Sequence, residues 1–95
     1  MASTIHYQLK QLEGSTALYA YATEAGEKKG LFEVDFVEYE RMCQKGQVPS
    51  IEDTVYLIRK SEHDSNFYGG IRVFFHLYKH YLQHGAYAQE YGQMA

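Results

Sequence analysis

Hydrophobic and polar residues alternate along the first part of the chain, which is the pattern of half-buried β-strands. In residues 4–10, the apolar residues Ile5, Tyr7 and Leu9 share one side. A glycine-centred turn, Glu13-Gly14-Ser15, follows this strand. We therefore expect a first strand that reverses direction near Gly14.

The segment after the turn alternates in side-chain size rather than in polarity. Leu18, Ala20 and Ala22 share one side, and Tyr19 and Tyr21 share the other. We expect the side with the small residues to lie beneath a bulky helix. The tyrosines on the other side would then form a contact patch.

A third alternating segment, Leu31–Asp35, follows a polar loop bounded by glycines. It places Phe32 and Val34 on one side and Glu33 and Asp35 on the other. The three segments together predict an antiparallel meander.

A short helix and a further strand are predicted next. Asp35 and Glu38 have the spacing of an acidic N-cap and an N3 carboxylate, which predicts a helix over about 36–45. The run Val55–Ile58, within 54–60, is apolar on both faces and predicts an interior strand.

The C-terminal segment Ile71–Gly85 predicts a long helix whose apolar arc spans roughly 200°, where a surface helix needs little more than 100°. Two explanations remain open. The sheet covers half of the arc and the first helix or residues 86–95 cover the rest, or a second chain covers it. The residues of the arc are Val73, Leu77, Tyr81, Phe74, Tyr78, Ile71, Leu82 and Phe75.

The predicted fold is a single α+β domain over residues 1–95. An antiparallel sheet of about four strands, in the order β-β-β-α-β-α, packs against the long C-terminal helix. Residues 86–95 are either a flexible tail or part of the fold. The expected core consists of Leu18, Phe32, Val34, Val55, Leu57, Ile71, Phe74, Tyr78 and Leu82.

Composition narrows the range of partners. The formal charge is −3 and no stripe of Lys and Arg is present, which disfavours nucleic acid. No stretch approaches about 18 apolar residues, so we expect no membrane partner. The single cysteine, Cys43, cannot form an internal disulfide, which together with the N-terminal sequence favours a cytoplasmic protein. Ten tyrosines without tryptophan are typical of half-buried sites and interfaces.

Three histidines recur at four-residue spacing on the predicted helix. The helical projection makes His76 solvated, places His80 at the rim of the apolar arc, and places His84 beside Val73 at the edge of the buried face. His80 and His84 are the candidate metal ligands, although a zinc site needs three or four ligands. No cofactor is predicted.

Glycines at the start of this helix are unfavourable, by about 1 kcal/mol each relative to alanine. Gly69-Gly70 therefore indicates a close packing contact, or amides that hold an anion with help from Arg72.

Catalytic signatures are weak. Glu33 and Asp35 would lie about 7 Å apart on one strand face, a separation compatible with acid–base chemistry, but charges on a solvated strand face are much more common. The sequence contains no nucleophile-elbow serine, dinucleotide glycine pattern or zinc-protease motif, and no catalytic residue is assigned.

Two hypotheses follow. The first is a small cytoplasmic protein-interaction module that acts as a homodimer. The second is a protein that binds a small ligand or a metal through His80 and His84 with Glu33 and Asp35. An enzyme is one form of this second hypothesis. The predicted contact residues of the first are Tyr19, Tyr21, Tyr56, Val73, Leu77 and Tyr81.

Overall fold

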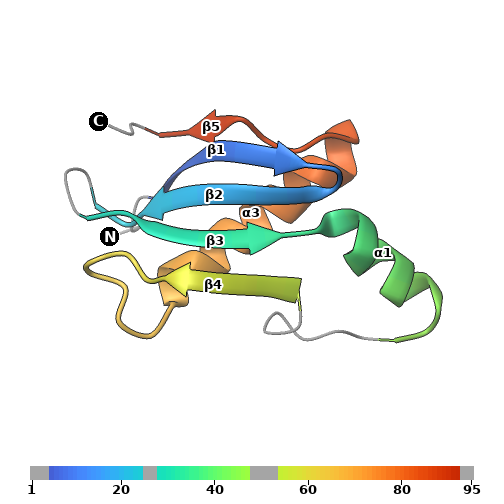
Figure 1. The fold of residues 1–95 in the computed structure, drawn as a ribbon, viewed down its shortest axis with the longest axis horizontal. Helices are drawn as coiled ribbons and strands as arrows, with labels where there is room; N and C mark the ends of the chain where they lie inside the picture. The colour runs from blue at the N-terminus through green and yellow to red at the C-terminus, as the bar shows by residue number, and fades with distance from the viewer. Residues whose placement is uncertain (1–4, 25–27, 48–53, 93–95) are drawn as a thin grey trace.

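The computed structural model describes residues 5–24, 28–47 and 54–92. The elements follow one another in the predicted order β-β-β-α-β-α, with one additional short strand at the end (Figure 1). The elements are β1 (His6–Glu13), β2 (Thr16–Ala22), β3 (Gly30–Val34), α1 (Phe36–Gln44), β4 (Val55–Arg59), α3 (Tyr68–His84) and β5 (Glu90–Tyr91).

The sheet has five antiparallel strands in the order β4-β3-β2-β1-β5. The predicted meander is confirmed, since β1, β2 and β3 are consecutive neighbours. The fifth strand was not predicted. It forms because the chain returns after α3 and pairs Tyr91 with Tyr7 and Glu90 with Gln8. Residues 86–92 of the predicted tail thus belong to the fold.

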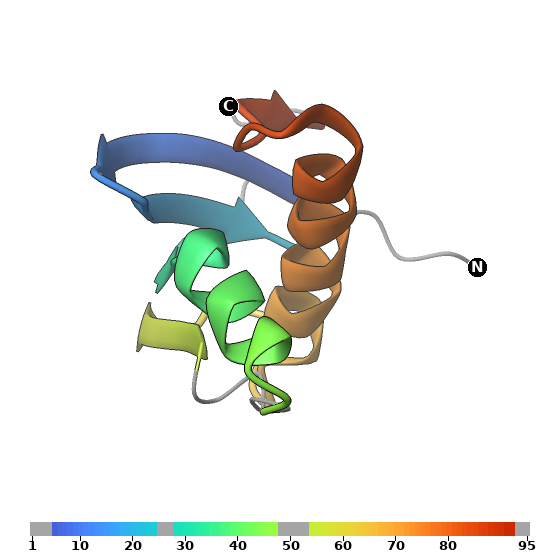
Figure 2. The ribbon, with the colours of Figure 1, turned by 90° about the vertical axis from the view of Figure 1, so that its right-hand side faces the viewer.

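The molecule has two layers. Helix α3 covers one face of the sheet, and α1 packs beside α3 at the end of β3 (Figure 2). Phe36 of α1 contacts Phe74 with ring centroids 5.5 Å apart, and Tyr39 contacts Tyr78 at 4.9 Å. In the described part of the chain, no helix covers the opposite face of the sheet.

Tyrosines form much of the core, and here the predicted orientation of β2 is wrong. Tyr19 and Tyr21 are buried on the side of α3, and the small side chains face the open side. The alternation defines two faces but not which one is covered. Burial of the rings is possible because internal acceptors satisfy both hydroxyls: Tyr19 donates to the Ala88 carbonyl at 2.7 Å and Tyr21 to Asp64 at 2.7 Å.

The expected core is confirmed for most of its members. Phe32, Val34, Val55 and Phe74 are buried, and Leu57 and Tyr78 are partly buried against them. Two other assignments are wrong and one is incomplete. Leu18 shares the open face of the sheet with Ala20, Leu82 is 58% exposed, and Ile71 is only partly buried.

The wide apolar arc of α3 is covered from within the same chain over most of its width. The sheet buries Val73 and Leu77. Phe36 then covers Tyr78 and Tyr81, with ring centroids 5.4 and 5.5 Å away, and stacks with Tyr87 at 5.6 Å. The first of the two explanations is therefore confirmed for this part of the arc.

The start of α1 and the end of α3 follow the local signals, whereas α3 begins at Tyr68, three residues before the predicted Ile71. Asp35 caps α1 by accepting a hydrogen bond from the Glu38 amide at 3.0 Å. Gly85 ends α3 with φ of 67°, a left-handed conformation that glycine adopts without strain.

Candidate functional site

The six predicted contact residues do not form one surface. Four of them lie in the core, where they offer no exposed area to a partner. Tyr81 is partly buried against Phe36 and Tyr87. Only Tyr56 is largely exposed, at 68%. The four buried residues are Tyr19, Tyr21, Val73 and Leu77.

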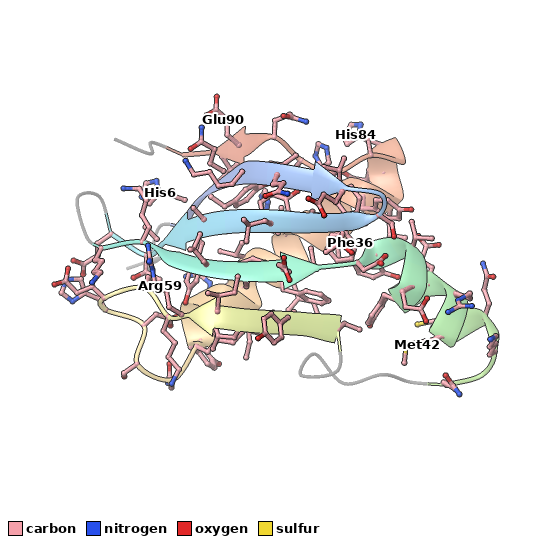
Figure 3. All side chains as sticks on the ribbon, in the orientation of Figure 1. His6, Phe36, Met42, Arg59, His84 and Glu90 are labelled. Atoms are coloured by element: carbon pink, nitrogen blue, oxygen red, sulfur yellow. The ribbon has the colours of Figure 1, made fainter. Side chains whose placement is uncertain are left out.

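The predicted order of exposure among the histidines is reversed. His76 is partly buried, with Nδ1 2.9 Å from the Tyr7 hydroxyl and its ring 4.4 Å from that of Tyr91. His84 is exposed at the C-terminal end of α3 (Figure 3). A helical projection of α3 alone could not include β5, which carries Tyr91 over the polar side of the helix.

The environment of His76 favours its neutral form. Burial lowers its pKa, and the nearby side chains of His80 and Lys79 lower it further. Burial also raises the pKa of Tyr7 to about 12, so the hydroxyl stays protonated in its hydrogen bond with the neutral imidazole.

This environment predicts a loss of stability in acid. In the unfolded chain the His76 imidazole binds a proton below a pKa of about 6.5, whereas in the folded chain it stays neutral to a lower pH. The free energy of unfolding therefore falls as the pH falls through this value. We expect the free energy of unfolding to drop less between about pH 7 and pH 5 in His76→Gln than in the unmodified protein. Urea unfolding at both pH values measures this difference. The same substitution at the exposed His84 is the control, and an equal drop in His76→Gln and the unmodified protein would contradict the assignment.

The predicted metal pair gains no third ligand from the residues that the structure describes. The rings of His80 and His84 are 4.4 Å apart. Within residues 5–24, 28–47 and 54–92, however, no group of three or more His, Cys, Asp or Glu side chains is placed to hold a metal ion. A stable zinc site needs three or four ligands. Nothing in this geometry therefore favours the metal hypothesis.

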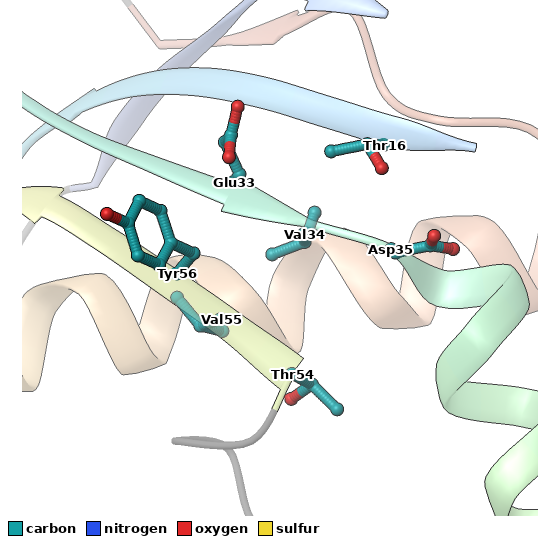
Figure 4. A pocket seen from close by; sticks show the side chains of 7 residues that line it. All are labelled: Thr16, Glu33, Val34, Asp35, Thr54, Val55 and Tyr56. Atoms are coloured by element: carbon teal, nitrogen blue, oxygen red, sulfur yellow. The ribbon is translucent and has the colours of Figure 1, made fainter. Parts of the chain in front are cut away.

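Glu33 and Asp35 line a pocket of about 230 Å³ between the ends of β3 and β4 (Figure 4). Asp35 is already engaged, because it caps α1 and accepts a hydrogen bond from the Ser15 hydroxyl at 2.8 Å. Neither His80 nor His84 lines this pocket, so the structure does not unite the acids and the histidines in one site. The lining residues are Thr16, Glu33, Val34, Asp35, Thr54, Val55 and Tyr56.

A buried carboxylate at the start of α3 was not predicted as a central group. Asp64 accepts hydrogen bonds from the amides of Gly69 and Gly70 at 2.7 and 3.0 Å, and from the Tyr21 hydroxyl at 2.7 Å. Tyr21 in turn accepts from the Ser61 amide at 3.1 Å. A carboxylate is favoured at a helix N-terminus, where amides point outward. The sequence signal is an aspartate five residues before a glycine pair.

The glycine pair is explained by close packing, as one of the two interpretations predicted. A Cβ atom at Gly69 would lie 2.2 Å from the Thr23 methyl, and one at Gly70 would lie 2.0 Å from the Phe67 ring. The anion at these amides is the side chain of Asp64, a residue of the same chain.

Three large apolar side chains stay exposed along α3. Tyr68, Phe75 and Leu82, which we call the α3 stripe, are 68%, 55% and 58% exposed. Their seven-residue spacing places them in a line on a helix. The line lies on the side away from the sheet, beyond the part of the arc that Phe36 covers.

The sheet has a second apolar feature at its edge. Strand β4 is the terminal strand on one side, so the prediction of an interior strand over 54–60 is wrong. Its Tyr56 and Ile58 are 68% and 47% exposed, because no helix of the described chain covers that face of the sheet. We call these two residues the β4 edge surface. The pairing of β3 with β4 is irregular between Leu31 and Phe32.

Comparisons with protein-family models, curated proteins and solved structures give no match to this chain. In the part of the chain that the structure describes, neither α1 nor α3 has the length and apolar character needed to cross a membrane.

Proposed function

We propose that this protein is a small interaction module that acts as a cytoplasmic homodimer, joined through β4. The observation that supports the proposal is the β4 edge surface, with Tyr56 and Ile58 on the outermost strand of the sheet. Edge strands present backbone donors and acceptors that can pair with another strand, and native proteins usually protect them with charges or proline. Strand β4 contains no proline, and its only charged residue is Arg59, the last residue of the strand.

Antiparallel pairing of two β4 strands suits this sequence. A two-fold axis at Leu57 would place Tyr56 across from Ile58 of the partner subunit. Aromatic and β-branched residues in such cross-strand pairs contribute roughly 0.2–1 kcal/mol each. The opposite edge, β5, is only two residues long and offers a much shorter ladder. The dimer would thus have one continuous sheet of both chains.

The cytoplasmic part of the proposal rests on Cys43. This cysteine is exposed and has no second cysteine with which to pair within the chain. An exposed thiol of this kind persists in a reducing compartment.

Ile58→Lys is expected to abolish the dimer, because a charge on an edge strand opposes pairing. We expect the dimer to have a dissociation constant in the micromolar range. Light scattering at about 10–100 µM should therefore give a mass that approaches two chains for the unmodified protein and one chain for the variant.

Leu12→Lys is the matched control, since Leu12 is 49% exposed near the β1–β2 turn. We expect this variant to dimerise normally. A strictly monomeric unmodified protein over the same range, or a dimeric Ile58→Lys protein with native circular dichroism, would refute the proposed dimer.

A further inference from the structure

Strand β5 is the shortest strand of the sheet and the last element of the described chain. Its two residues pair with β1 alone, Tyr91 across from Tyr7 and Glu90 across from Gln8. Each of the other strands has at least five residues. Segments with so few backbone contacts open at a small cost in free energy, so the side chains around β5 decide whether it stays on the sheet.

The chain directly before β5 is held more firmly. The Ala88 carbonyl accepts the hydrogen bond of the buried Tyr19 at 2.7 Å, and the Gln89 carbonyl accepts one from the Leu9 amide at 2.7 Å. Ala88 is itself buried in the core. Residues 90–92 can therefore leave the sheet while the core keeps its contacts.

Two imidazoles lie against this end of the chain, one on each face of the sheet. On the α3 side, the ring of Tyr91 is 4.4 Å from that of His76 and stacks on that of Tyr7 at 5.6 Å. On the other face, a Cβ atom at Gly92 would collide with Nδ1 of His6, so this buried ring packs directly against the backbone. Imidazoles change their charge near neutral pH, and β5 therefore rests on a surface that responds to pH.

The surroundings of His76 contain positive charge and no compensating acid. Its neighbours among the described residues are Tyr7 of β1, Tyr91 of β5, and Arg72, Lys79 and His80 of α3. Glu90, the acid of β5, lies across from Gln8 and therefore on the other face of the sheet. Burial lowers the pKa of His76 most, and His80 and Lys79 lower it further. Docking of β5 is thus favoured above about pH 6.5 and weakens as the pH falls below this value.

We propose that β5 is a pH-sensitive strap, docked on β1 while His76 is neutral and released when His76 takes up a proton. Release gives the imidazolium access to water, which solvates its charge. It also leaves the outer edge of β1 unpaired at Tyr7 and Gln8. The inference goes beyond the proposed dimer, because β5 lies at the opposite edge of the sheet from β4.

Thermodynamic linkage supplies the first test. If docking of β5 opposes protonation of His76, removal of the Tyr91 ring makes protonation easier by the same amount. We expect NMR titration to show a proton affinity of His76 at least about threefold higher in Tyr91→Ala than in the unmodified protein. Tyr91 is 46% exposed, so this variant should fold. Tyr68→Ala is the control, because Tyr68 is exposed at the far end of α3 and its removal should leave His76 unchanged.

The second test measures release directly. Nuclear Overhauser contacts between the rings of Tyr7 and Tyr91 should be strong at about pH 7.5 and fall at least about twofold at about pH 5. In His76→Gln they should persist at both pH values. Contacts between the core rings of Phe36 and Phe74 are the internal control, since they should stay constant while only β5 moves.

Several results would overturn the inference. These are an unchanged proton affinity of His76 in Tyr91→Ala, a Tyr7–Tyr91 contact that persists in acid, or an equal loss of this contact in His76→Gln. Simultaneous loss of the Phe36–Phe74 contact would show unfolding of the whole domain rather than release of a strap. Light scattering on Ile58→Lys tests the dimer separately, so failure of one proposal does not decide the other.

Discussion

Phe74→Ala is expected to lower the free energy of unfolding by about 3–5 kcal/mol, a large share of the roughly 5–15 kcal/mol typical of a domain. Phe74 is fully buried between the sheet and α1. Its ring lies 5.5 Å from that of Phe36 and 5.9 Å from that of Tyr39. Truncation leaves a cavity where two helices and the sheet meet, and rigid aromatic neighbours cannot fill it. Urea unfolding followed by circular dichroism measures the loss.

The adjacent Phe75 supplies the control for this experiment. It is 55% exposed, so Phe75→Ala should cost no more than about 1 kcal/mol. Equal losses for the two variants, or a Phe74→Ala protein with unchanged stability, would contradict the packing of α3 described above.

Asp64→Ala is the second change with a large expected effect, a loss of about 3–5 kcal/mol. The substitution leaves the amides of Gly69 and Gly70 and the Tyr21 hydroxyl without their acceptor. These groups are buried, so each pays a desolvation cost that no protein group compensates. The first turn of α3 should therefore fray. Chemical denaturation gives the stability, and amide hydrogen exchange at Gly69 and Gly70 shows where protection is lost.

Asp64→Asn separates the loss of charge from the loss of acceptors. Its amide has one carbonyl oxygen and keeps the size of the side chain, so we expect a smaller loss than for alanine. Glu62→Ala removes an exposed acid from the same loop and should change stability by less than about 0.5 kcal/mol. Protection at Gly69 that is unaffected in Asp64→Ala would exclude the proposed capping role.

Features with local causes were predicted correctly. The period-two alternation identified β1, β2 and β3, and the Asp35–Glu38 pair identified the start of α1. The glycine pair indicated a close contact, which Thr23 and Phe67 provide. The strands and the start of α1 depend on neighbouring residues, and the glycine pair depends on the steric limits of its own positions, although Thr23, one of the contacts, comes from a distant segment.

Features that depend on distant segments were predicted poorly. Leu82 is apolar and lies on the arc of α3, but no other element of the described chain buries it. His76 lies on the polar side of its helix and is nevertheless partly covered, because Tyr91 returns beside β1. The candidate ligands His80 and His84 lie together, and so do the candidate acids Glu33 and Asp35, but the pocket that the acids line contains neither histidine.

The amino-acid sequence by itself determined the α+β class, the order of the elements from β1 to α3 and the positions at which α1 and α3 end. These properties follow from hydrophobic period and capping, which act over a few residues. The tertiary structure alone decided that Tyr19 and Tyr21 form the core, since burial of their hydroxyls requires Ala88 and Asp64 as acceptors. It also decided which apolar residues stay exposed, because exposure depends on which face each neighbouring element covers. The α3 stripe and the β4 edge surface are the result.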